Sequence, residues 1–343
     1  MAVVDSQWHW YPPAFLDAHI GRTHGPRAVR TAEGYVYEVS PDEVWKYDRR
    51  FTDLDHQVRV LDEAGIDMAV VSVAAAGDVN DRDRAEARDL CLLLNEELSR
   101  AQATHPGRFA ALAHLPLKHP DLALDMLEDA VGRLGLRGIY LPGSIDGMSV
   151  ADERVWPVYA RAEELGLPLF LHPTRSFREP RVTPYKMEVT IGYMFDTSFA
   201  SMSLIVGGVL DRHPRLKIVH PHVGGTLPYL HGRIDVYRGK GWWPDLDRPF
   251  ADYLRRMWFD TVCNQPESLS LLADLVGPSR LLFSSDYPYW STRHGIDLVR
   301  KVIPDDQVAG VLGGNAIELL SPAVGAVSSP ASPPTPSSAP HST

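Results

Sequence analysis

Residues 216–225 read Leu-Lys-Ile-Val-His-Pro-His-Val-Gly-Gly, a short apolar run that ends in two histidines and two glycines. Similar runs occur at 169–173, Leu-Phe-Leu-His-Pro, and at 283–288, Phe-Ser-Ser-Asp-Tyr-Pro. Apolar runs of this length are typical of strands buried on both faces of a parallel sheet. Polar residues at the ends of such strands favour an α/β barrel, because barrel active sites are built at the carboxyl ends of the strands.

On both sides of these runs, predicted strands alternate with helical patterns along the whole chain. Helices are predicted over Asp55–Ala64, which is followed by Gly65, and over the amphipathic stretch Arg84–Thr104. An open dinucleotide-binding sheet is disfavoured, because no GxGxxG follows the first strand. We therefore predict the α/β class and a single (β/α)8 TIM barrel. The eight predicted strands are Val3–Asp5, Met68–Val73, Phe109–Leu115, Leu136–Leu141, Leu167–His172, Leu216–His222, Trp258–Asp260 and Arg280–Ser285.

Two connections are too long to be simple turns, namely Trp10–Thr52 after the first strand and Pro173–Tyr193 after the fifth. Both leave the carboxyl end of a strand, where long loops usually form lids and walls of binding sites. Residues 321–343 are rich in Pro, Ser and Ala, and such a segment cannot bury enough apolar area to fold. We expect one barrel domain over residues 1–320 and a disordered tail over residues 321–343.

Composition excludes several classes of protein. The formal charge of the 343 residues is -10, which argues against a nucleic-acid-binding protein. No apolar run approaches the roughly eighteen residues of a membrane helix, and the first residues do not resemble a signal peptide. Cys91 and Cys263 lie far apart and outside any CxxC pair, as expected for reduced thiols. We predict a cytoplasmic protein without a membrane or nucleic-acid partner.

Polar side chains stand at four of the predicted strand ends: His9, His172, His222 and Asp286. In a closed barrel these ends converge on one mouth, and Gln7 would point the same way as His9 because the two are two residues apart on a strand. Imidazole nitrogens and a carboxylate are suitable ligands for Zn²⁺, or for Mn²⁺ where oxygen donors dominate. The sequence therefore predicts a catalytic divalent-metal site.

These residues fall in motifs that resemble the amidohydrolase superfamily, in the amidohydrolase-related branch typified by aminocarboxymuconate semialdehyde decarboxylase. That branch carries D-x-H-x-H-x-x-P, HP, H-x-G-G and G-[ST]-D-x-P after strands one, five, six and eight. The resemblance covers about residues 2–320. The matching stretches here are DSQWHWYP at 5–12, HP at 172–173, HVGG at 222–225 and SSDYP at 284–288.

The resemblance implies that His9, His172 and Asp286 are metal ligands and that His222 activates water or contacts the substrate. Gln7 departs from the pattern, because the branch usually has a histidine there, although some of its decarboxylases have a carboxylate. Gln7 could be a ligand, an amide that contacts the substrate, or a sign of weakened metal affinity. We expect it to be a weak ligand or to support the ligands from behind. The resemblance also implies a homodimer.

Several further side chains are candidates for contact with the substrate. Trp10 and Tyr11 lie past the first strand and could form a wall for an aromatic or unsaturated substrate. Arginines can clamp a carboxylate with two hydrogen bonds, and candidates occur in both long loops. Trp8 is expected to pack inside the barrel, and His220 to pack there or to support the site from behind. Asp5 is expected to support the ligands of the first strand by hydrogen bonding, or to cap that strand. The arginine candidates are Arg175 and Arg178, with Arg49 and Arg50 as alternatives.

The preferred hypothesis is a metal-dependent, non-oxidative decarboxylase of a small unsaturated or aromatic carboxylic acid, with His222 and Asp286 as proton carriers. The same residues could instead activate water to hydrolyse an amide, a lactone or a carbon–carbon bond. A third possibility is a metal-free barrel that binds a small molecule, which only the departure at Gln7 supports. No organic cofactor is indicated.

Overall fold

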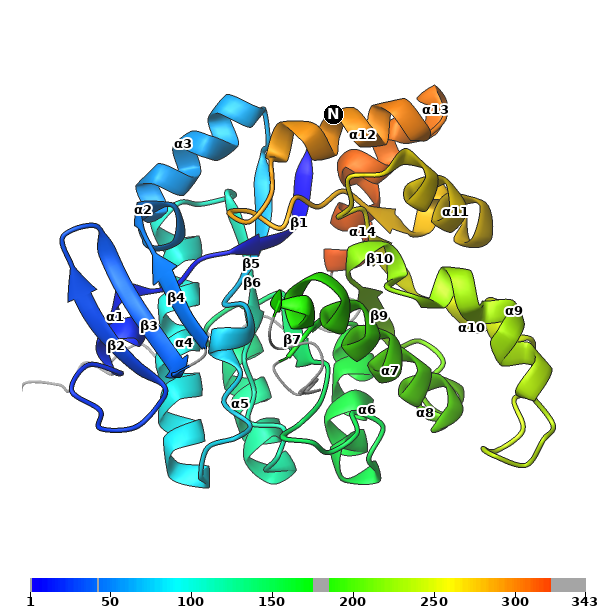
Figure 1. Ribbon diagram of the computed structural model, residues 1–343, viewed down its shortest axis with the longest axis horizontal. Coiled ribbons are helices and arrows are strands. Elements are labelled where there is room, and N and C mark those ends of the chain that lie inside the picture. The colour runs from blue at the N-terminus through cyan, green and yellow to red at the C-terminus, as the bar shows by residue number, and fades with distance from the viewer. Residues whose placement is uncertain (1, 42, 175–184, 322–343) are drawn as a thin grey trace, which may run out of the picture.

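The computed structural model describes residues 2–41, 43–174 and 185–321, and its core is a ring of eight parallel strands (Figure 1). Their order in the sheet follows the order of the chain. Backbone bonds close the ring: the Ser6 amide donates to the Phe283 carbonyl at 2.8 Å, and the His9 amide to the Tyr287 carbonyl at 2.9 Å. The TIM barrel predicted from the sequence is confirmed. The strands are β1 (Val4–His9), β5 (Met68–Ser72), β6 (Phe109–Ala113), β7 (Gly138–Pro142), β8 (Pro168–His172), β9 (Lys217–His220), β10 (Trp258–Asp260) and β11 (Leu281–Leu282).

Helices surround the barrel and bury one face against it, as the amphipathic patterns in the sequence predicted (Figure 1). The helix α3 begins at an Asp53 side chain that accepts from the His56 amide, and it ends at Gly65 in the left-handed conformation. The helices are α1 (Pro13–Asp17), α2 (Arg49–Thr52), α3 (Leu54–Ala64), α4 (Arg84–Thr104), α5 (Pro120–Gly132), α6 (Trp156–Leu165), α7 (Tyr193–Val206), α8 (Val209–Arg212), α9 (Leu227–Tyr237), α10 (Phe250–Leu254), α11 (Pro266–Val276), α12 (Thr292–Val302), α13 (Asp305–Ala309) and α14 (Asn315–Leu320).

The first long connection is not an irregular loop. It folds into a three-stranded antiparallel sheet formed by β2 (Arg27–Thr31), β3 (Gly34–Ser40) and β4 (Glu43–Tyr47), which stands at one side of the barrel (Figure 1). Most strand boundaries also differ from the prediction by one to a few residues, and two of these differences concern site residues. The strand β1 extends to His9, and β9 ends at His220, so His222 lies in the short 3-10 turn His222–Gly224.

The barrel interior below the polar mouth is filled with apolar side chains, and α14 seals its amino end. Ala316 and Leu319 of α14 pack on the inward-facing residues of the strands, and the Lys217 ammonium donates to the Leu319 carbonyl at 2.9 Å. This is the end of a barrel at which side chains serve stability. The inward-facing strand residues of this cluster are Val4, Val70, Leu112, Tyr140, Phe170, Val219 and Leu282. Of the predicted tail, residues 322–343 lie outside the described residues.

One helical stretch, Glu188–Val206, is long and apolar enough by length and composition to cross a membrane, with a mean hydropathy of 1.3 over its best window. The expectation that no segment approaches this length is therefore wrong. The core helix of a soluble protein has the same properties, and 44% of this window is buried. The stretch combines the π-helical turn Glu188–Gly192 with α7, and α7 buries Asp196, Ser198 and Ser201 against the barrel.

Candidate active site

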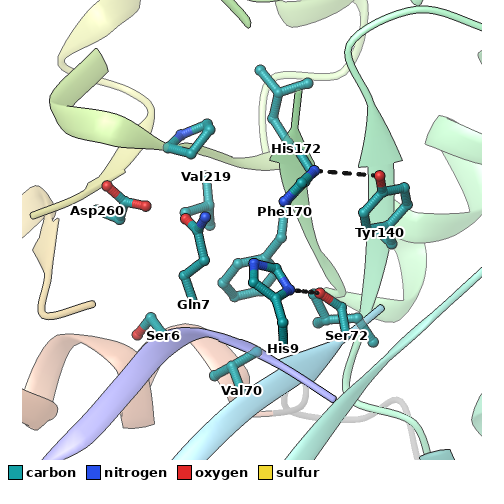
Figure 2. A pocket seen from close by; sticks show the side chains of 13 residues that line it. Ser6, Gln7, His9, Val70, Ser72, Tyr140, Phe170, His172, Val219 and Asp260 are labelled. Carbon is teal, nitrogen blue, oxygen red and sulfur yellow. Dashed lines mark hydrogen bonds between the residues drawn. The ribbon is translucent and has the colours of Figure 1, made fainter. Parts of the chain in front are cut away.

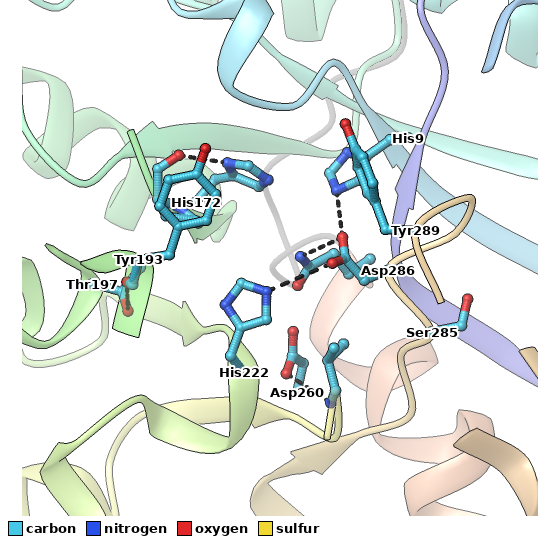
Figure 3. A network of polar contacts seen from close by, with 12 residues as sticks. His9, His172, Tyr193, Thr197, His222, Asp260, Ser285, Asp286 and Tyr289 are labelled. Atoms are coloured by element: carbon cyan, nitrogen blue, oxygen red, sulfur yellow. Dashed lines mark hydrogen bonds and ion pairs between the residues drawn. The ribbon is translucent and has the colours of Figure 1, made fainter. Parts of the chain in front are cut away.

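The carboxylate of Asp286 is the meeting point of the polar residues at the carboxyl end of the barrel (Figure 3). Its Oδ1 lies 2.9 Å from His9 Nε2 and accepts from Gln7 Nε2 at 3.0 Å. Its Oδ2 forms a longer ion pair of 3.7 Å with His222 Nε2. The convergence of side chains that stand 279 residues apart in the chain follows from closure of the barrel between β1 and the segment after β11.

His172, at the end of β8, lies beside His9 with the two ring centroids 5.0 Å apart and the rings nearly perpendicular. Its Nδ1 contacts the Pro173 carbonyl at 2.8 Å, a bond that requires a proton on Nδ1 and leaves the lone pair on Nε2. Tyr140 lies 3.4 Å from the same nitrogen, and Ser72 lies 3.5 Å from His9 Nδ1 (Figure 2). Such partners behind a histidine orient its ring.

Three residues at this mouth have backbone conformations that non-glycine residues rarely adopt. The φ angles are 53° at His222, 48° at Val223 and 56° at Asp286. The left-handed region costs a residue with a side chain about 1–2 kcal/mol, and most for a β-branched one such as Val223. Strain of this kind persists where the surrounding structure holds it, and it gathers at functional sites.

Burial and neighbouring charges shift the pKa values of the titratable groups in this cluster. Burial opposes ionisation of Asp286, but contacts with His222 and His9 outweigh it and hold its pKa below the usual range. Burial lowers the pKa of His172 to about 3, so its imidazole is neutral. Burial alone would lower the pKa of His222, yet the neighbouring Asp286 and Asp260 carboxylates raise it above its ordinary value. Burial also raises the pKa of Asp260 to about 6.

The donor chemistry of this cluster fits a divalent cation. It combines a buried carboxylate with two buried imidazoles, which is a common ligand set for Zn²⁺ and Mn²⁺. Asp260 adds a buried Oδ2 that has no hydrogen-bond partner among the described residues. Among the described residues, no three His, Cys, Asp or Glu side chains already surround one point at metal-binding distance, and His9 and Asp286 contact each other directly.

A pocket of about 570 Å³ opens above the cluster and includes His172, His222 and Asp286 in its lining. Its walls are mainly apolar and aromatic, and they come from separate parts of the chain: β4, the segment before and at the start of α7, and the segments after β10 and β11. Ligand pockets of this size usually combine apolar walls with a few polar groups. The aromatic lining residues are Tyr11, Trp45, Tyr47, Tyr193, Tyr289 and Trp290.

Of the side chains predicted to contact the substrate, some line the pocket and others do not. Tyr11 lines the pocket, and its hydroxyl lies 2.8 Å from that of Tyr289. Trp10 is buried and donates to the Thr52 carbonyl, and the structure does not place it in the pocket. Arg175 and Arg178 lie outside the described residues. Arg49 and Arg50 contact His56 and Asp48 on the exterior and are not among the lining residues.

The residues expected to have supporting roles have them. Trp8 is fully buried, stacks on Tyr287 and donates to Gln57. His220 is fully buried with its Nδ1 2.8 Å from Ser201 Oγ. Asp5 accepts from the amides of Ser285 and Gln7, so it ties β1 to the turn that carries Asp286.

Some residues of the site were missed in the sequence. Asp260 ends a predicted strand and Tyr289 lies three residues after Asp286, so both could have been found by extending the strand-end argument. Trp45 and Tyr47 gave no such signal, because they come from the inserted sheet.

Comparison with known proteins agrees with this geometry. The family model described as amidohydrolase matches residues 4–321. The 2-amino-3-carboxymuconate-6-semialdehyde decarboxylase of Dictyostelium discoideum is 27% identical over 284 residues, covering 78% of this chain and 76% of that protein. The gamma-resorcylate decarboxylase of a Rhizobium species is 28% identical over 296 residues, covering 79% and 87%.

Solved structures show the same fold. The 5-carboxyvanillate decarboxylase LigW from Sphingomonas paucimobilis superposes with a TM-score of 0.79 at 26% identity, covering 93% of this chain and 99% of that one. Two further structures with this fold contain bound manganese. The chain therefore belongs to the amidohydrolase family, in the branch of the aminocarboxymuconate semialdehyde decarboxylases that its motifs predicted.

Proposed function

We propose that this protein is a metal-dependent, non-oxidative decarboxylase of a small unsaturated or aromatic carboxylic acid. The observation that carries the proposal is the position of Asp286: its carboxylate joins His9 and His222 at the floor of a pocket with mainly aromatic and apolar walls. Such walls suit a flat, conjugated ring. The relatives are decarboxylases of acids of this class, which supports the proposal.

The ligands that we propose for the metal are His9, His172 and Asp286. Both Zn²⁺ and Mn²⁺ suit two imidazoles and a carboxylate. When bound there, the metal would supply positive charge that holds substrate oxygens and offsets their developing negative charge. Gln7 donates to Asp286 through its amide nitrogen, so we assign it to orienting that carboxylate rather than to the ligand set.

The protein's own contribution to the reaction is to hold the substrate and deliver a proton. His222 lines the pocket within 3.7 Å of Asp286, and we propose this pair as the proton carriers. A proton added to the ring carbon that bears the carboxylate interrupts conjugation. The bond from that carbon to the carboxylate then breaks, its electron pair restores the conjugated system, and CO₂ leaves.

The experiment is a screen of aromatic and muconate-like acids with the metal-reconstituted protein, with CO₂ release and product formation measured together. We expect CO₂ in a one-to-one ratio with the product that lacks a carboxyl group, and none from an Asp286→Ala variant. Hydrolysis of an amide, lactone or carbon–carbon bond without CO₂ would support the hydrolase alternative. Ligand binding without any turnover would support the binding-protein alternative.

We further propose that the enzyme is cytoplasmic and forms a homodimer. Both cysteines are free, with Cys91 buried and Cys263 half-buried, as expected in a reducing compartment. The family resemblance supports the homodimer. Sedimentation velocity of the purified chain tests it, and a single species at the monomer mass would contradict it.

A further inference from the structure

In the chain, α7 follows β8, which ends in His172, and precedes β9, which leads into the turn of His222. Asp196 and Ser198 are two residues apart and therefore face roughly opposite sides of the helix, since successive residues turn by about 100°. Both are buried. Buried polar side chains are costly unless they are paired, so their partners indicate what the helix holds.

On one side, Asp196 binds the segment that follows β8. Its Oδ2 accepts from the Thr174 amide at 2.8 Å and from the Thr174 hydroxyl at 3.2 Å. The carboxylate lies so close to Gly143 that a Cβ at that position would overlap Oδ2. Gly143 in turn donates to the His172 carbonyl at 2.9 Å. The carboxylate thus holds the backbone that follows Pro173, and Gly143, against which it packs, holds the His172 carbonyl before Pro173.

On the other side, Ser198 and Ser201 bind the segments that flank His222. Ser198 Oγ accepts from the amide and from the hydroxyl of Thr226, each at 2.9 Å, and donates to the Met194 carbonyl at 2.6 Å. A Cβ on Gly225 would lie 2.6 Å from both Ser198 Oγ and the Met194 carbonyl oxygen, so only glycine fits there. Ser201 Oγ lies 2.8 Å from His220 Nδ1. The strained turn of His222 is therefore held by α7 before and after it.

The same helix forms a wall of the substrate pocket. Tyr193 and Met194 in its first turn, and Val189 and Thr190 just before it, line the cavity. We infer that Asp196, Ser198 and Ser201 are positioning residues, which set His172 and His222 relative to this wall. Because the inference concerns residues of the proposed decarboxylase site, it rests on the proposed function.

The test compares Asp196→Ala, Asp196→Asn and Ser198→Ala with the wild type. The measurements are the Kd for Mn²⁺ of the apoprotein, by competition with a chelator, together with kcat, KM and Tm. We expect Asp196→Ala to weaken Mn²⁺ binding by about 10–100-fold and to raise KM, as removal of groups that orient ligands does. Asp196→Asn keeps an oxygen acceptor for Thr174 and should stay within about threefold of the wild type.

Ser198→Ala is the milder variant, should Asp196→Ala fail to fold. We expect it to raise KM by about 3–10-fold, since it removes three hydrogen bonds worth about 1 kcal/mol each. Ser99→Ala is the matched control, because Ser99 makes an equivalent bond from α4 to the Leu134 carbonyl. The Ser99→Ala substitution should lower Tm and leave the Kd for Mn²⁺ and KM unchanged. Variants that lose Tm but keep the wild-type Kd and KM would overturn the inference and leave the proposed function standing. A wild type that neither binds Mn²⁺ nor releases CO₂ would overturn both.

Discussion

The two ends of the barrel are built from the same eight strands and have opposite character. At the carboxyl end, the buried His9 contacts both the Asp286 carboxylate and the His172 ring, and His222 and Asp286 have left-handed backbones. At the amino end, Val4 and Leu282 belong to one apolar cluster with Ala316 and Leu319 of α14. The strand β1 spans both environments, with Val4 of the apolar cluster at its start and His9 of the polar cluster at its end.

The contrast between the two ends shows how the fold separates stability from chemistry. The amino end contributes apolar burial, which stabilises the fold. The carboxyl end contains buried charges, strained residues and unpartnered polar atoms, which oppose folding. Substitutions at the carboxyl end should therefore change activity more than stability, and substitutions at the amino end should do the reverse.

The largest expected effect is at the carboxyl end, from His222→Gln. Loss of a positioned proton donor should lower kcat by about 10²–10⁴-fold, while the variant keeps its metal and its Tm changes little. Steady-state kinetics and metal content measure this. The comparison variant is His220→Gln, because His220 has the same HxH spacing but contacts Ser201. It should retain kcat within about tenfold, and an equal loss in both variants would contradict the roles assigned here.

At the amino end, Leu319→Ala should do the opposite. Leu319 is 3% exposed, and truncation of a buried leucine costs about 2–5 kcal/mol of unfolding free energy through lost burial and a residual cavity. Denaturant unfolding measures this loss. At a temperature where the variant is folded, kcat/KM should stay close to that of the wild type. A large drop in kcat/KM in the folded variant would show that the two ends are coupled rather than separate.

A smaller effect is expected on metal affinity, from substitution of Gln7. Gln7→Glu places a carboxylate where the family has a histidine or a carboxylate, and it should strengthen Mn²⁺ binding about tenfold, or 1.4 kcal/mol, through the added negative charge. Isothermal titration of the apoprotein measures the change. Gln7→Ala serves as control and should weaken binding only slightly. Unchanged affinity in Gln7→Glu would argue that this side chain lies too far from the metal to act on it.

The smallest predicted effect concerns the strained turn after β9. Val223 has a φ of 48°, and asparagine adopts this conformation more readily than a β-branched residue. Val223→Asn should therefore raise the unfolding free energy by about 0.5–1 kcal/mol, measured by chemical denaturation. If stability falls instead, the contacts of the valine side chain outweigh the backbone strain.

Much of this architecture could be predicted from the sequence. Runs such as Leu169–His172 are apolar for buried strands and polar at their ends, so both the barrel and the meeting of His172 with His9 and Asp286 follow from periodicity and topology. The sequence motifs at the strand ends also identified the family. Assignment of His222 over His220 also depended on the motif, because strand parity alone does not separate them.

Other features could not be predicted because they depend on tertiary contacts. The sheet of β2, β3 and β4 contributes Trp45 and Tyr47 to the pocket, but no local pattern connects that segment with the barrel mouth. Trp10 is next to Tyr11, yet only Tyr11 reaches the pocket, since the Trp10 side chain turns to the Thr52 carbonyl. The role of Asp196 in α7 becomes visible only through its contact with Thr174.

The most direct test of a metal-dependent site at the carboxyl end is the metal content of the protein purified without chelators, measured by plasma mass spectrometry beside an Asp286→Ala variant. We predict close to one Zn²⁺ or Mn²⁺ per wild-type chain and far less in the variant, because Asp286 lies at the centre of the ligand cluster. Absence of metal from both proteins, even after reconstitution with Zn²⁺ and Mn²⁺, would contradict the account.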